Sequence, residues 1–96
     1  MQIDASQFIF NLEGQTVRES DKPDAKETTL GMVIGRQLAQ QERASDPLRN
    51  WALAQKFYAG GTVDVTAEDI VLIKKVVTES PMYAFVTARI LQELDK

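Results

Sequence analysis

The chain has 96 residues, of which 44% are hydrophobic and 26% charged, and it contains neither cysteine nor histidine. This size indicates one domain over 1–96, and the missing side chains exclude disulfides, thiolate zinc sites and a Ser-His-Asp triad. The net charge of −3 argues against nucleic-acid binding, which draws most of its affinity from basic side chains. We therefore expect no enzyme, no cofactor and no metal ion.

The N-terminal part favours a β-hairpin over about 7–18. A β-prone Phe-Ile-Phe run at 8–10 is followed by a Glu-Gly pair, after which Thr-Val resumes the β pattern. Gly14 is therefore expected to supply the positive φ of the turn. The residues at 18–27 carry charges of both signs and no large apolar side chain, which is typical of a solvated, flexible connector.

The spacing of apolar residues predicts a first helix over about 30–43, which Thr28 or Thr29 would cap. Gly31 and Gly35 lie four residues apart on one side of this helix. Because a glycine inside a helix costs about 1 kcal/mol relative to alanine, something is expected to approach closely there. The approaching group is either another element of the same chain or a subunit or ligand.

A second helix is predicted over about 47–59, with the Asp-Pro pair at 46–47 as its cap and first residue. The Gly-Gly pair at 60–61 is expected to end it. Trp51 lies in the apolar stripe of this helix. We expect its indole in the core rather than on a platform that stacks a base or cofactor.

A short strand is predicted near 62–65, where polar and apolar residues alternate, and we expect it to pair with the N-terminal hairpin. Thr66 then gives a hydroxyl cap, and the acids at 68–69 suit the positive first turn of a helix. These signals predict a third helix over about 67–79.

The Ser-Pro pair at 80–81 repeats the combination of cap and proline, and it predicts a last helix over about 81–94. The predicted fold class is therefore α+β and mostly helical, with one hairpin, four short helices and one further strand. No apolar run approaches the length of a membrane span, and the N-terminus lacks a signal-peptide pattern. We expect a soluble, intracellular protein with no membrane association.

The predicted helices carry broad aromatic and methionine surface for so small a domain. Surface left over after the core is filled would favour a homo-oligomer or a groove for another protein. The alternative is that all of it fits inside one core. The candidate interface residues are Trp51, Tyr58, Met82, Tyr83 and Phe85.

Two further classes of function remain open. A local basic patch would suit a nucleic-acid-binding regulator, although the acidic net charge of the chain argues against such a partner. The residues of this patch are Arg49, Lys56, Lys74 and Lys75. Metal-dependent hydrolysis could use the carboxylates of Asp64, Glu68 and Asp69, but helix capping is the simpler explanation of these acids.

The order of several short motifs resembles a group of small phage and prophage accessory proteins. These motifs are a Leu-Glu-Gly-Gln turn at 12–15, a Thr-Leu-Gly-x-Val helix start at 29–33, an Ala-Leu-Ala-Gln-Lys-Phe-Tyr helix at 52–58 and the stretch Val-Asp-Val-Thr-Ala-Glu-Asp-Ile-Val-Leu-Ile-Lys at 63–74. The long linker and the Ser-Pro-Met-Tyr entry to the last helix depart from the group's pattern.

The resemblance implies a protein made in the cytoplasm of an infected or lysogenic bacterium. It implies action by binding another protein, of the phage or of the host, in assembly, host takeover or counter-defence. The group has no secure biochemical activity, so the resemblance assigns no catalytic residue.

Overall fold

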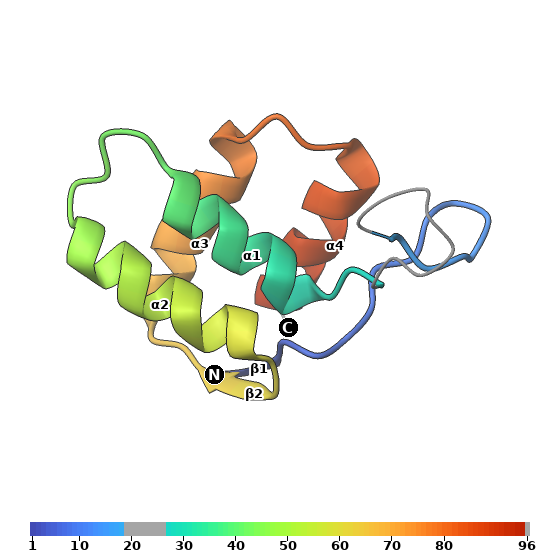
Figure 1. The fold of residues 1–96 in the computed structure, drawn as a ribbon, viewed down its shortest axis with the longest axis horizontal. Helices are drawn as coiled ribbons and strands as arrows, with labels where there is room; N and C mark the ends of the chain where they lie inside the picture. Colours follow the sequence, from blue (N-terminus) through green and yellow to red (C-terminus); the bar gives the residue numbers. More distant parts are fainter. Residues whose placement is uncertain (19–26, 96) are drawn as a thin grey trace.

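The computed structural model describes residues 1–18 and 27–95, and Figure 1 shows this part of the chain as helices with a small two-stranded sheet. Within it, the mostly helical α+β class predicted from the sequence is confirmed. None of its helices is long and apolar enough to cross a membrane. The elements are β1 (Gln2–Asp4), α1 (Leu30–Gln40), α2 (Pro47–Ala59), β2 (Thr62–Asp64), α3 (Ala67–Glu79) and α4 (Ala84–Leu94).

Helix α1 holds the fold together, because it packs against α2 on one side and against α3 behind it, while α3 in turn packs against α4 (Figure 1). The sheet lies below α2 in this view. Every element contributes at least one apolar side chain to a single core. The largest fully buried side chains belong to Phe57, Ile3, Ile9, Leu30, Ile34, Leu38, Ile73, Ile90 and Val77.

The sheet pairs two short strands that lie far apart in the sequence. β1 runs antiparallel to β2, with Ile3 opposite Val63, and these two residues are buried while their neighbours in both strands are exposed. The prediction of a strand near 62–65 is confirmed, but the prediction of its partner is wrong. It pairs with residues 2–4 rather than with a hairpin at 7–18, because Ile3 supplies the inward-facing residue that matches Val63.

Residues 8–17, which we call the arm, contain the predicted turn but no regular hairpin strands. Gly14 has a φ of +81°, as predicted, and Phe10 forms an isolated bridge with Thr16. Regular pairing fails because Ile9 divides its hydrogen bonds, donating to the carbonyl of Thr28 at 3.3 Å and accepting from the amide of Val17 at 3.0 Å. The predicted connector lies outside the described residues except at its two ends.

Two helix boundaries differ from the prediction. α1 ends at Gln40, short of the predicted end at 43, and Arg43 has a φ of +54°, which no right-handed helix accommodates. α4 begins at Ala84 rather than at 81. The predicted capping role of Ser80 is wrong, because its hydroxyl donates to the carbonyl of Val76 at 2.6 Å and so closes α3 instead of opening α4.

The other capping predictions are confirmed. The Thr29 hydroxyl accepts the amide of Met32 at 3.2 Å at the start of α1. The Asp46 carboxylate accepts the amide of Arg49 at 3.1 Å at the start of α2. Gly60 ends α2 with a φ of +83° and donates its amide to the carbonyl of Phe57. These caps satisfy amide and carbonyl groups that the helices leave without internal partners.

A polar cluster fixes the base of the arm on α4. Gln7 donates to Glu93 at 3.0 Å and accepts from Arg89 at 2.6 Å, and Arg89 also donates to Glu93 at 2.9 Å. The Glu93 side chain is only 7% exposed. Such a carboxylate is stable in the interior only when it is paired and hydrogen-bonded, so the segment before the arm is held at a defined place on α4.

Candidate protein-binding surface

Two glycines let α2 pack closely against α1. A Cβ atom on Gly31 would overlap the carbonyl oxygen of Phe57 and would lie 2.6 Å from the Cβ of Ala5. A Cβ atom on Gly35 would lie 2.9 Å from the carbonyl oxygen of Ala54. The close approach predicted from the sequence is therefore confirmed, and the approaching groups belong to α2 and to the segment after β1.

An open groove of about 610 Å³, which we call the α1–α2 groove, lies along this contact. Trp51 and Tyr58 stand seven residues apart on α2, a spacing that places them on one face of the helix, and both side chains line the groove. They are 56% and 54% exposed. The lining residues are Gly35, Arg36, Ala39, Gln40, Trp51, Ala54, Gln55, Tyr58 and Ala59.

The core prediction for Trp51 is wrong. The buried stripe of α2 consists of Asn50, Leu53, Ala54 and Phe57, which turns Trp51 outward. Asn50 takes an inner position because its amide donates to the carbonyl of Leu38 at 3.0 Å and to the side chain of Gln41 at 2.6 Å. A buried amide with both of these partners avoids the cost of burying an unsatisfied polar group.

A second groove of about 690 Å³, the α1–α4 groove, lies between α1 and the start of α4. Met82 and Tyr83 line it. Tyr83 is 78% exposed, and its ring stacks on that of Phe85 at a centroid distance of 6.0 Å. Met82 and Phe85 are half-buried against the core, and Phe85 lines neither groove.

The two grooves share Arg36, which is the single charged residue among the described residues that line either of them. Its guanidinium carbon lies 5.8 Å from the centre of the Tyr58 ring, a cation–π contact. Four of the five predicted interface residues thus fall into two pairs that flank α1. Arg36 and Ala39 were not predicted from the sequence, although Ala39 follows Gly35 by four residues and extends the same small-residue stripe.

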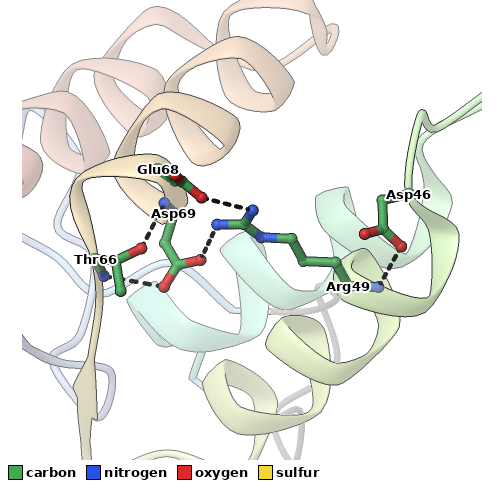
Figure 2. Close-up of polar contacts among 5 residues, drawn as sticks. All are labelled: Asp46, Arg49, Thr66, Glu68 and Asp69. Atoms are coloured by element: carbon green, nitrogen blue, oxygen red, sulfur yellow. Dashed lines mark hydrogen bonds and ion pairs between the residues drawn. The ribbon is translucent and has the colours of Figure 1, made fainter.

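Half of the predicted basic patch is paired with carboxylates. Figure 2 shows Arg49 reaching from α2 to the start of α3, where its guanidinium pairs with Asp69 at 2.7 Å and with Glu68 at 3.3 Å. Lys74 pairs with Asp95 at 2.6 Å. Two of the four predicted cations are therefore neutralised by neighbours, which halves the local charge available to attract phosphates.

The acids at the start of α3 take part in these ion pairs and in the capping of the helix. Thr66 and Asp69 form a reciprocal capping box, in which each side chain accepts the other's backbone amide (Figure 2). Partial burial pushes the pKa of the Asp69 carboxyl upward, but hydrogen bonds from Thr66 and Arg49 outweigh it and hold that pKa below its ordinary value. The hydrogen bond to Asp69 in turn raises the pKa of Arg49.

The capping prediction for these acids is confirmed, and their carboxylates are committed to Thr66 and Arg49 rather than converging on a vacant site. Among residues 1–18 and 27–95, no group of three Asp or Glu side chains is placed to hold a metal ion. The alternative of metal-dependent hydrolysis through Asp64, Glu68 and Asp69 therefore gains no support from the geometry.

No protein family, curated protein or solved structure that was compared with the chain matches it. The resemblance to phage accessory proteins consequently stays a prediction from the sequence motifs.

Proposed function

We propose that this chain is a non-enzymatic protein-binding accessory protein, and that the α1–α2 groove is where it binds its partner. The observation that carries the proposal is the pair Trp51 and Tyr58, both more than half exposed on the wall of one groove. Tryptophan and tyrosine are the residues most enriched at the energetic centres of protein interfaces. Their exposure also contradicts the alternative that all apolar surface fits inside the core.

The lining of the groove favours protein over nucleic acid as the partner. Arg36 is its single charged residue, whereas a phosphate backbone would be expected to meet several lysine or arginine side chains. Small exposed residues on both walls, Ala39 on α1 and Ala59 on α2, leave room for the side chains of a partner to enter. An apolar centre that is poor in charged residues is typical of a protein interface core.

The sequence motifs complete the proposal. Because their order resembles small phage and prophage accessory proteins, we place the chain in the cytoplasm of a bacterial host, with a phage or host protein as its partner. Assembly, host takeover and counter-defence are the roles that this origin suggests.

Site-specific photocrosslinking tests the proposal. A photoreactive phenylalanine analogue replaces Trp51 or Tyr58 in turn, and the variants are expressed in the cells in which the gene resides. The matched control carries the analogue at Leu48, which is 81% exposed on the same helix and lines neither groove. We expect discrete adducts with another protein from positions 51 and 58 and none from position 48. Adducts that are absent, or equal at all three positions, would contradict the proposal.

A further inference from the structure

We propose that the chain associates with itself head to tail, with the arm of one copy seated in the α1–α2 groove of the next. This inference rests on the proposed function, since both require the groove to bind protein, and it names a second copy as an occupant. The geometry points to it because the same chain carries an exposed apolar projection and an exposed apolar groove in different places.

The arm exposes a run of large apolar side chains at every second position. Phe8 is 44% exposed, Phe10 is 55% exposed and Leu12 is 95% exposed, whereas Ile9 between the two phenylalanines is fully buried. Alternation of this kind places Phe8 and Phe10 on one side of an extended segment. About half of each phenylalanine and nearly all of Leu12 are left in contact with solvent, although Ile9 holds the base of the arm in the core.

The arm and the groove match in length. Residues 8–12 span at most about 13 Å in an extended chain. The wall of the groove on α2 runs from Trp51 to Ala59, which corresponds to about 12 Å of helix. A volume of about 610 Å³ is in the range that admits several side chains at once.

The two surfaces also match in charge. Glu13 follows Leu12 directly at the tip of the arm, and Arg36 is the one charged residue that lines the groove within the described part of the chain. A carboxylate brought to the rim of an apolar groove beside a guanidinium would fix the register of the arm. This complementarity favours the arm over an uncharged apolar segment as the occupant.

The contact is expected to be heterologous. In Figure 1 the arm lies at one end of the longest axis of the molecule and α2 at the other. A copy that has formed one such contact therefore still offers its arm or its groove at its other end, so further copies can add there and build a ring or an open chain.

A mixing experiment with two variants tests this arrangement. Leu12→Asp disables the arm, and Ala39→Glu places a carboxylate in the groove, where it excludes the arm and repels Glu13. Both positions are exposed, so both variants should keep the fold, which circular dichroism and thermal melting would verify. Phe10→Ser and Gln55→Glu replace them if either fails to fold. Val71→Asp, at a 68% exposed position outside both grooves, is the control.

Light scattering and sedimentation equilibrium supply the readout. The wild type and Val71→Asp should exceed the monomer mass of 10.7 kDa increasingly with concentration. Each of the two test variants alone should stay monomeric at concentrations where the wild type associates. Its dissociation constant for self-association should be raised by about tenfold or more relative to the wild type. An equimolar mixture of the two should form a heterodimer and nothing larger, because one intact arm meets one intact groove.

Three results would overturn the inference. These are a wild type that stays monomeric up to about 1 mM, a test variant that associates like the wild type, and a mixture that remains monomeric. The photocrosslinks distinguish this failure from that of the proposed function. A monomeric chain whose groove crosslinks to another protein refutes self-association alone, and a self-associating chain with no crosslink to another protein refutes the wider binding role alone.

Discussion

Replacing Gly31 with alanine tests whether the close contact between α1 and its neighbours is as tight as the structure has it. Gly31 is buried within α1, where its missing side chain leaves room for backbone from two other segments. The added methyl group would overlap the carbonyl oxygen of Phe57 and would lie 2.6 Å from the Cβ and 2.9 Å from the carbonyl oxygen of Ala5.

The size of the effect follows from two opposing contributions. Alanine stabilises a helix interior by about 1 kcal/mol relative to glycine. Forcing a methyl group into a filled core costs about 1–3 kcal/mol, and the upper end applies here because the colliding atoms are backbone oxygens and a Cβ that cannot rotate away. The net loss is therefore about 2 kcal/mol, a large fraction of the stability of a small domain.

Urea unfolding followed by circular dichroism measures this loss, and the melting temperature should fall by about 10 °C. Gly35→Ala is the matched comparison, because its Cβ would meet one atom closer than 3.0 Å, the carbonyl oxygen of Ala54. It should cost less than Gly31→Ala. Ala52→Gly, at an exposed position of α2, calibrates helix propensity alone and should cost about 1 kcal/mol. A Gly31→Ala variant as stable as the wild type would refute the argument.

Two further predictions concern charged groups. Asp69→Asn should lower the free energy of unfolding by about 1 kcal/mol at neutral pH, because the capping of α3 becomes weaker. The pKa of Asp69 is lower in the folded state than its ordinary value of 3.8. In urea titrations at different pH, the difference between variant and wild type should therefore be complete above pH 3.8 and should disappear as the pH falls through the folded-state pKa. A difference that persists in acid would contradict this assignment. Glu93→Ala should lower the free energy of unfolding by about 1–3 kcal/mol, because Gln7 and Arg89 lose their buried acceptor. Hydrogen exchange of the Ile9 amide should also become faster. The exposed control Gln92→Ala should change neither quantity.

The features that could be predicted from the sequence are those settled within a few residues. Thr29, Asp46 and Thr66 each hold their hydroxyl or carboxylate within hydrogen-bonding reach of an amide three positions later, so the local order of residues is enough to identify them. Ser80 shows the limit of this reasoning, because a hydroxyl between two helices can serve either one. Here it bonds to the helix that precedes it.

Strand pairing could not be predicted in the same way. β1 has three residues and no partner nearby in the chain, and its partner β2 begins at Thr62. Pairing over such a separation depends on the loop that the intervening helices close, not on the propensity of either strand. The arm illustrates the same point, because Ile9 bonds to Thr28 as well as to Val17 and so leaves the local hairpin incomplete.

The sequence identified several of the residues that line the candidate surface but not how they are arranged in grooves. The close packing of α1 and α2 accounts both for the α1–α2 groove and for the wrong prediction that Trp51 lies in the core. Gly35 brings α2 close to α1, so Ala54, which faces it, must be small. Asn50 takes an inner position of the same stripe because it bonds to α1. That choice of inner stripe turns Trp51 and Tyr58 outward along the rim. A bulky residue at 35 would push the helices apart and widen the space between them, so the glycine that tightens the core also shapes the groove that the two aromatic side chains wall.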